Sequence, residues 1–342
     1  MLKKIALSLI VLLCLCAGLI MGYVTKELSL EYSGPTNYFI IEPGDTFGKI
    51  NQHLYDQGFI SNKRLFHYYG KYHGWLEKFK AGTYEIKSGS KIENVFQQLV
   101  FGTPILLSVT LPEGKNMYEM AKIFEEKGFF SAQDFLQAAQ DEDLLSAYQI
   151  PAENLEGYLY PETYKFAPKT PAKTVVKAMV QLFFQKTKDI PSHPELNRHQ
   201  LIILASMVEK ETGAKFEQKT IAGVFHNRLK KKMRLESDPT TIYGIWDRYQ
   251  GNLKKSDLQT PTPYNTYKIP ALPIGPICNP SLEAVKAVLE PEVHNFLFFV
   301  SRNDGTHVFT ENYQSHTEAV INFQKNPRAR SGKSWRDLKQ EN

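Results

Sequence analysis

Two glutamates in the segment Leu204–Thr212 could supply acid–base chemistry. The segment reads Leu-Ala-Ser-Met-Val-Glu-Lys-Glu-Thr, and on a helix its apolar residues form one buried stripe. Glu209 falls on one flank of that stripe, where apolar neighbours would desolvate its carboxyl group and favour the neutral form that a general acid needs. Glu211 falls on the other flank, so the two cannot act as a pair, and the periodicity does not choose between them. A solvated glutamate at a helix edge would show the same pattern.

Polar and aromatic residues gather in the sequence after these glutamates. They are Asn227, Arg228, Ser237, Asp238, Thr240, Tyr243, Thr260, Tyr264, Asn265 and Tyr267, with Asn279, His307 and Phe309 further on. Sugar rings bind to proteins by stacking on aromatic faces and by hydrogen bonds to amide and hydroxyl groups. A helix cap at Ser237 or Asp238 and a structural proline-rich loop would explain each residue singly. Their density around one loop favours a binding groove.

Other chemistries find little support. His294, His307 and His316 lack the tight spacing of a metal site, and the sequence has no His-x-x-x-His pair, so no metal is expected. The glycine-rich phosphate-binding patterns of nucleotide enzymes do not occur, and Ser206 lacks a Gly-x-Ser-x-Gly turn. We therefore expect no organic cofactor.

The charge distribution argues against a nucleic-acid partner. The chain has 342 residues, 41 Lys and Arg against 36 Asp and Glu, and a formal net charge of +5. Lys3, Lys4 and residues 325–342 carry the positive excess, which leaves the middle of the chain near neutral. A nucleic-acid surface would need a basic face. An uncharged polymer remains open as the substrate.

An apolar run near the N-terminus predicts a membrane anchor. Ile5–Val24 holds no charge, and a helix of this length spans about 30 Å, one hydrocarbon core. Lys3 and Lys4 precede it, which predicts that residues 1–4 stay in the cytoplasm and the body lies on the outer, periplasmic side of the cytoplasmic membrane. A cleaved signal peptide is the alternative, although such peptides have shorter apolar cores.

The rest of the chain predicts an α+β protein with a small module followed by a larger mixed domain. Residues 25–37 are a polar linker, and residues 38–103 predict the strand–helix–helix–strand layout of a LysM-like sugar-binding module, followed by a further helix. Residues 104–150 form a connecting helical segment, residues 151–325 the catalytic domain and residues 326–342 a basic tail. The elements expected in the catalytic domain are helices over 171–186, 197–216, 218–233, 280–289 and 317–323, a proline-rich loop over 260–280, and a hairpin of strands 296–300 and 307–309.

Six segments in order together resemble the endolytic murein transglycosylase family, the MltG or YceG-like proteins. They are Leu155–Tyr164, Leu204–Thr212, Phe225–Leu229, Met233–Gly244, Thr260–Tyr267 and Leu272–Ile277. The resemblance implies cleavage inside peptidoglycan glycan strands, between N-acetylmuramic acid and N-acetylglucosamine, that leaves a 1,6-anhydro end. It identifies Glu209 as the catalytic residue and adds Glu156 to the substrate-binding residues. Glu236 departs from the family, in which Gln is more common.

The implied mechanism needs one carboxyl group in two roles. It protonates the glycosidic oxygen, and the carboxylate then takes a proton from the C6 hydroxyl group of the muramic acid, which attacks the anomeric carbon. This mechanism needs no second carboxylate, whereas a hydrolase uses two. If Asp238 acted as a second catalytic carboxylate, the reaction would be hydrolysis instead. The resemblance also implies a limit on nascent strand length and penicillin-binding proteins as partners. A lysozyme-like hydrolase and a non-catalytic glycan-binding scaffold remain as alternatives.

Overall fold

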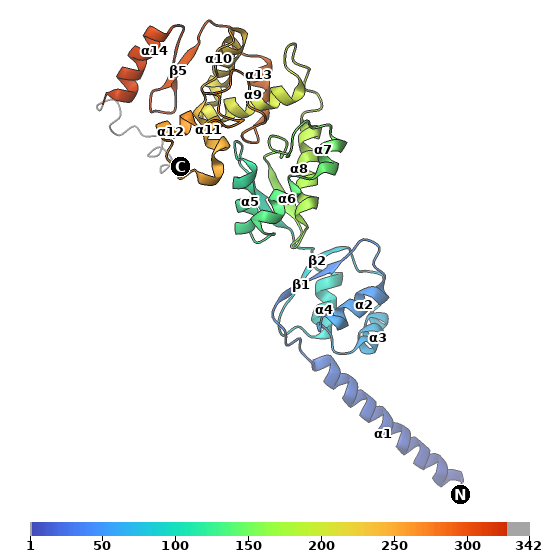
Figure 1. The fold of residues 1–342 in the computed structure, drawn as a ribbon. Coiled ribbons are helices and arrows are strands. Elements are labelled where there is room, and N and C mark those ends of the chain that lie inside the picture. The colour runs from blue at the N-terminus through green and yellow to red at the C-terminus, as the bar shows by residue number, and fades with distance from the viewer. Residues whose placement is uncertain (1, 327–342) are drawn as a thin grey trace. The chain divides into compact units, whose positions relative to one another are not determined.

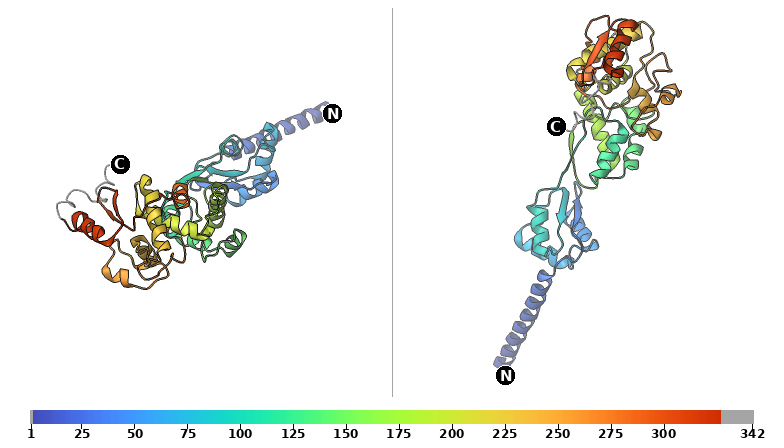
Figure 2. Two further views of the ribbon diagram at one scale, coloured as in Figure 1. Left: turned by 90° about the horizontal axis from the view of Figure 1, so that it is seen from above. Right: turned by 90° about the vertical axis from the view of Figure 1, so that its left-hand side faces the viewer.

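The computed structural model describes residues 2–326, and the chain divides into two units (Figures 1 and 2). The first unit contains the chain up to residue 108 together with residues 165–169. The second contains residues 109–164 and the chain from residue 170 onward. Both helices and strands occur in each unit, which confirms the expected mixed α+β class. The predicted basic tail falls outside the described residues, except for Asn326.

Helix α1 (Leu2–Ser29) carries the apolar run of the N-terminus. Its part Leu7–Ser29 is long and apolar enough to cross a membrane, with a mean hydropathy of 2.6 and no buried residues in that window. By length and composition it fits a single-pass anchor. The helix continues to Ser29, so the first part of the expected linker is helical.

The small module of the first unit has the expected order of elements. They are β1 (Asn37–Ile41), α2 (Phe47–Asp56), α3 (Lys63–His73), β2 (Gly82–Ile86) and α4 (Ile92–Val100). The two strands pair antiparallel, with Phe39 opposite Tyr84. Side chains from all five elements, among them Phe39, Leu54, Phe66 and Phe96, are buried together as one hydrophobic core. The likeness of this module to LysM stays a prediction, because the order of elements alone does not test it.

The second unit begins with short helices that carry their own capping residues. Its first elements are β3 (Leu107–Thr110, which begins in the first unit), α5 (Met117–Glu126), α6 (Ala132–Ala138), α7 (Glu142–Ala147) and β4 (Thr163–Phe166). Strands β3 and β4 form a two-stranded sheet. Asn116 with Glu119, and Ser131 with Asp134, form capping boxes that satisfy the free N–H groups at the starts of α5 and α6.

The remaining elements of the second unit include one buried helix, α9 (Arg198–Glu211). The others are α8 (Ala172–Lys186), α10 (Gln218–Lys230), α11 (Asp238–Gly244), α12 (Lys255–Gln259), α13 (Leu282–Leu289), β5 (Phe298–Ser301), β6 (His307–Thr310) and α14 (Tyr313–Val320). Every residue from Leu201 to Val208 is buried, because α9 packs against α10, α11 and α13 (Figure 1). The predicted hairpin is confirmed, with Val300 opposite Val308. The proline-rich loop contains no helix or strand between α12 and α13, as expected.

Two expected helix ends were wrong, and the helix expected over 317–323 begins earlier, at Tyr313. The helix expected over 197–216 ends at Glu211, since Thr212 is extended and Lys215–Glu217 forms a separate 3-10 turn. The helix expected over 218–233 ends at Lys230. Lys232 then takes a positive φ of 55°, which lets the chain reverse toward α11. Both glutamates of the first motif therefore lie in the last turn of α9.

Candidate active site

Glu209 and Glu211 emerge where α9 leaves the core. Residues two positions apart on a helix point in directions about 200° apart, so the side chains of Glu209 and Glu211 leave α9 on opposite sides. Both residues are partly buried, between fully buried Val208 and Thr212, which is 8% exposed. Each meets a different serine from a distant part of the chain, and these two serines define two different environments.

Glu209 contacts the N-terminal end of α13. Its Oε2 accepts hydrogen bonds from the backbone N of Ser281 at 3.1 Å and from the Ser281 hydroxyl group at 2.6 Å. The same hydroxyl oxygen caps α13 by accepting from the N of Ala284. On another side lies Gly114, where an added Cβ would stand 3.4 Å from Glu209 Cγ. Two donors from the helix cap therefore already engage one oxygen of Glu209.

Glu211 contacts the start of α11. Its Oε1 accepts a hydrogen bond from the hydroxyl group of Ser237, which is only 2% exposed. Burial raises the pKa of Glu211 to about 7, and the charge of Asp238 raises it further, against the Ser237 hydrogen bond and the Arg228 charge, which lower it. A carboxyl group with such a pKa is partly protonated at neutral pH. A group that first donates and then accepts a proton needs this property.

Threonine hydroxyl groups fix Ser237 in place. Thr240 is fully buried, and its Oγ1 donates to the Ser237 carbonyl oxygen at 2.6 Å. The N–H of Ser237 donates to Thr266 Oγ1 at 2.9 Å, and the two threonine hydroxyl groups lie 2.8 Å apart. The preceding residue, Glu236, has a φ of 52°, an unusual conformation for a residue with a side chain. The loop and α11 thus hold the Ser237 hydroxyl group toward Glu211.

Asp238 and Tyr267 form the outer, more exposed part of this site. The Tyr267 hydroxyl group donates to Asp238 Oδ1 at 2.7 Å, and Asp238 is exposed. Burial, followed by the charge of Asp238, raises the pKa of Tyr267, so this hydroxyl group keeps its proton and can act as a donor.

Arg228 and Asn227 brace the site through backbone carbonyl groups. Arg228 is 7% exposed, and its guanidinium group donates to the carbonyl oxygens of Leu297 at 2.6 Å and Leu235 at 2.8 Å. Asn227 Nδ2 donates to the carbonyl oxygens of His294 and Phe296. Both side chains join α10 to the chain segment before β5, and Arg228 also holds the loop before Ser237.

Asn265 organises the proline-rich loop. It is fully buried, and its Nδ2 donates to the Thr260 carbonyl oxygen at 2.7 Å. Its Oδ1 accepts from the N of Tyr267 at 2.9 Å and from the Thr241 hydroxyl group at 3.1 Å. The Thr260 hydroxyl group accepts a hydrogen bond from Arg248. A loop with so many prolines cannot form ladder hydrogen bonds, so this amide replaces them.

Glu156 lies in a separate buried network. It is 1% exposed, and its carboxyl group accepts from the N of Met117, from the Tyr243 hydroxyl group at 3.0 Å and from Asn279 Nδ2 at 2.7 Å. Burial raises the pKa of Glu156 to about 8. The ring of Tyr243 packs 4.7 Å from that of Tyr264, and burial raises the pKa of Tyr264 to about 12.

The predicted residues therefore fall into four groups. The first group, on the Glu211 side, contains Ser237, Asp238, Thr240 and Tyr267, and the second contains Glu156, Tyr243 and Tyr264. The third group shapes the loop and contains Thr260 and Asn265, and the fourth braces the site and contains Asn227 and Arg228. None of the hydrogen bonds described above joins Glu209 to any of these groups. Sequence reasoning missed the two residues that contact Glu209, which are Ser281 and Gly114. The Asn-Pro-Ser sequence before α13 is nevertheless typical of a helix start.

A buried pair of side chains was also missed. His307 Nδ1 lies 2.7 Å from Glu217 Oε2, and the N–H of His307 donates to Glu217 Oε1 at 3.0 Å. The pair joins β6 to the 3-10 turn that follows α9. Within residues 2–326, no group of three His, Cys, Asp or Glu side chains is arranged to hold a metal ion.

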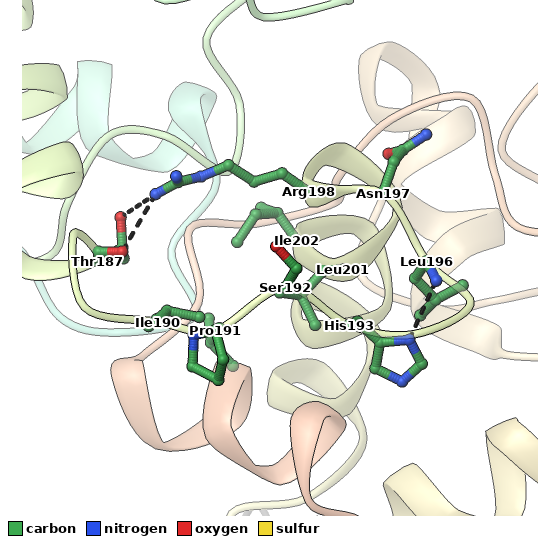
Figure 3. Close-up of a pocket in the computed structure, with 11 residues that line it drawn as sticks. Thr187, Ile190, Pro191, Ser192, His193, Leu196, Asn197, Arg198, Leu201 and Ile202 are labelled. Atoms are coloured by element: carbon green, nitrogen blue, oxygen red, sulfur yellow. Dashed lines mark hydrogen bonds between the residues drawn. The ribbon is translucent and has the colours of Figure 1, made fainter.

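A cavity of about 280 Å³ lies at the opposite end of α9 (Figure 3). It is lined by the connection between α8 and α9, by the first turns of α9 and by Val285. Arg198 reaches from the start of α9 to Thr187, where its guanidinium group donates to the hydroxyl and carbonyl oxygens (Figure 3). Because Arg198 and Glu209 are about 16 Å apart along the helix, this cavity is distinct from the glutamate sites.

Comparisons with known proteins link the chain to bacterial cell-wall enzymes. The model of the YceG-like family matches residues 39–322. The protein named endolytic murein transglycosylase in Bacillus subtilis is 30% identical over 298 residues, which cover 82% of both chains. A protein of the same name in Streptococcus pneumoniae is 27% identical over 323 residues, but the match spans only 57% of its length.

A solved structure shares this fold. The crystal structure of a YceG-like protein from Listeria monocytogenes matches with a TM-score of 0.57 and 28% sequence identity. The match covers 84% of this chain and 99% of the other chain. The segments that carry both glutamates, Ser237 and the proline-rich loop all lie within the residues that the family model matches.

Proposed function

This chain belongs to the YceG-like family, and from that premise we propose that it is a peptidoglycan lytic transglycosylase that cuts within glycan strands. The relatives from Bacillus subtilis and Streptococcus pneumoniae are named endolytic murein transglycosylases. The bond cut joins N-acetylmuramic acid to N-acetylglucosamine, and the new end is 1,6-anhydro-N-acetylmuramic acid. The observation that carries the proposal is the desolvated carboxyl group of Glu211, held by Ser237 among the predicted groove residues.

One carboxyl group with a pKa of about 7 can perform both proton transfers. In its protonated form Glu211 donates the proton to the glycosidic oxygen as the bond to the anomeric carbon breaks. The resulting carboxylate accepts the proton of the muramic acid C6 hydroxyl group, whose oxygen bonds to the anomeric carbon. The first proton stays on the departing glycosidic oxygen, the C6 hydroxyl proton restores the acid form of Glu211, and the substrate itself supplies the nucleophile in place of water.

The choice of Glu211 differs from the prediction for Glu209, which rests on the resemblance and stays a prediction. Two observations favour Glu211. Its carboxyl group has a raised pKa and contacts the Ser237 site, near Asp238. Glu209 Oε2, by contrast, accepts its two hydrogen bonds from Ser281 at the start of α13, and none of the hydrogen bonds described above joins Glu209 to the predicted groove residues.

Exposure divides the predicted substrate-binding residues into two kinds. Asp238 is exposed and Tyr264 and Tyr267 are partly exposed, so these side chains can reach a glycan. Glu156, Thr240 and Asn265 are at most 1% exposed and are bonded to protein groups, so we propose that they position the loop and α11.

Product analysis tests the proposal. The full chain, its Glu211→Gln variant and its Glu209→Gln variant are each incubated with peptidoglycan, and the released muropeptides are identified by mass spectrometry. We expect 1,6-anhydro products from the parent protein, a loss of about 10²–10⁴-fold in rate for Glu211→Gln, and a smaller loss for Glu209→Gln. The reverse order of losses would return the catalytic role to Glu209.

The same experiment decides between the alternatives. Reducing ends that carry oxygen from labelled water would show hydrolysis. No turnover by the parent protein, with glycan binding retained, would identify a scaffold.

The orientation in the membrane and the cellular partners are also part of this proposal. Lys3 and Lys4 in the first turn of α1 favour a cytoplasmic N-terminus, and with it a second unit on the periplasmic side, where peptidoglycan lies. There the enzyme would cut nascent strands and limit their length beside penicillin-binding proteins. Cross-linking of the full chain in cells tests this partnership.

A further inference from the structure

A basic pocket lies between α2 and α3 in the first unit. Its volume is about 330 Å³, and Lys63 and Arg64 contribute the positive charges. Lys63 Nζ donates to Gln52 Oε1 at 2.6 Å and lies 5.1 Å from the centre of the Tyr55 ring. Among residues 2–326, neither Lys63 nor Arg64 has a carboxylate within ion-pair distance. The pocket therefore holds two positive charges without a partner of opposite charge.

The side-chain oxygen of a buried amide at this pocket accepts no hydrogen bond from the described residues. Asn51 lines the pocket and is 8% exposed. Its Nδ2 donates to the Lys63 carbonyl oxygen at 3.0 Å, but its Oδ1 is buried with no partner among the described residues. A buried acceptor left without a donor is unfavourable, so a ligand that brings a hydroxyl group would satisfy it.

Two hydrogen bonds place this pocket beside the end of the apolar helix. Asn62 Nδ2 donates to the Tyr23 hydroxyl group at 3.2 Å, and Ser61 Oγ donates to Glu27 Oε2 at 3.1 Å. Tyr23 stands at the end of the uncharged run, a position where aromatic residues meet lipid headgroups. Lys63 and Arg64 directly follow Asn62 as the first two residues of α3, so the pocket lies near Tyr23 and close to headgroup level.

The exposed face of α3 suits the same environment. Tyr68, which also lines the pocket, is 65% exposed, and Tyr72, one turn further on, is 86% exposed. A tyrosine has an apolar ring and a polar hydroxyl group, and such side chains are favoured at the boundary between lipid and water.

We propose that this pocket binds the headgroup of an anionic phospholipid in the leaflet that α1 leaves at Tyr23. The phosphate group contacts Lys63 and Arg64, and a headgroup hydroxyl group, as in phosphatidylglycerol, donates to Asn51 Oδ1. Asp56 is bonded to Gln52 and Glu27 to Ser61, and neither carboxylate forms an ion pair with Lys63 or Arg64. Such a contact fixes the first unit against the membrane surface.

Native mass spectrometry of the full chain in detergent tests this site. The retention of dioleoyl-phosphatidylglycerol is compared with that of dioleoyl-phosphatidylcholine for the parent protein and for the double variant Lys63→Gln with Arg64→Gln. The matched control is Lys71→Gln with Lys78→Gln, which removes the same charge from the same unit outside the pocket. Arg64→Gln alone provides a milder variant, because Arg64 is exposed.

Each outcome supports or overturns the proposal. We expect the parent protein to prefer phosphatidylglycerol, the pocket variant to bind it on the order of 20-fold more weakly, and the control pair to change it little. Equal losses in both double variants would show general electrostatic attraction and overturn the proposal. So would displacement of the lipid by millimolar glycerol phosphate, which would identify a soluble phosphate ester as the ligand. A pocket variant that keeps its lipid preference but loses binding of N-acetylglucosamine oligomers would show that the pocket is a glycan site.

Discussion

The hydroxyl group of Ser237 donates a hydrogen bond to Glu211 Oε1, which joins the last turn of α9 to the start of α11. The contact brings together residues 26 positions apart. It lowers the proton affinity of Glu211, because a donor to the carboxylate opposes the larger rise in pKa that burial causes. If Glu211 is the catalytic acid, this hydrogen bond adjusts the pH range in which the enzyme works.

Replacing Ser237 by alanine should move the alkaline limb of the activity profile to higher pH. The variant removes a hydrogen bond that lowers the pKa of Glu211, so this pKa rises above about 7 and the acid keeps its proton at higher pH. The measurement is the pH dependence of kcat/KM on purified glycan strands. Ser281→Ala is the matched control, because it removes the corresponding hydroxyl group from Glu209. A shift in Ser281→Ala alone would contradict the assignment.

Replacing Asp238 by asparagine should move the same limb in the opposite direction. The charge of Asp238 raises the pKa of Glu211, so its removal lowers that pKa and the acid loses its proton at lower pH. The same pH series measures the shift. The products should remain 1,6-anhydro ends, since the C6 hydroxyl group of the substrate is the nucleophile. Loss of hydrolytic products in this variant would instead identify Asp238 as the base of a hydrolase.

Glu156→Gln should flatten the dependence of stability on pH. The pKa of Glu156 is raised from 4.5 to about 8 in the folded state, so the folded protein holds a proton that the unfolded chain releases between these values. Stability from this group is present below pH 4.5 and is lost as pH rises toward 8, by at most about 1.4 kcal/mol per pH unit. Urea unfolding at several pH values measures the slope. The exposed Glu142 provides the control, and a Glu142→Gln variant should keep the parent slope.

Asn279→Ala should destabilise the second unit. The fully buried side chain accepts hydrogen bonds from the N atoms of Gly157 and Leu159, each at 2.9 Å, and donates to Glu156 and to the Lys115 carbonyl oxygen. Truncation leaves several buried polar groups without partners, so we expect the free energy of unfolding to fall by about 3 kcal/mol. Urea unfolding measures it. A change below about 1 kcal/mol would mean that water replaces the amide.

Local patterns predicted much of the fold. The N-terminal helix, the order of elements in the small module and the hairpin of β5 and β6 all follow from runs of apolar residues and from turn residues near them. Helix ends were less predictable. The end of α9 at Glu211 depends on Thr212, whose extended conformation accompanies contacts with Ala214 and Glu217. Such contacts do not show in helical periodicity.

The sequence by itself determined which residues were available for chemistry: two glutamates on opposite flanks of one apolar helix, and a later group of polar and aromatic side chains. It could not decide which glutamate meets that group. Only the packing of α11 and α13 on α9 decided that Ser237 contacts Glu211 and that Ser281, 72 positions from Glu209, contacts Glu209. The physical reason is that periodicity records direction around a helix, whereas proton affinity depends on which distant groups exclude water and donate hydrogen bonds.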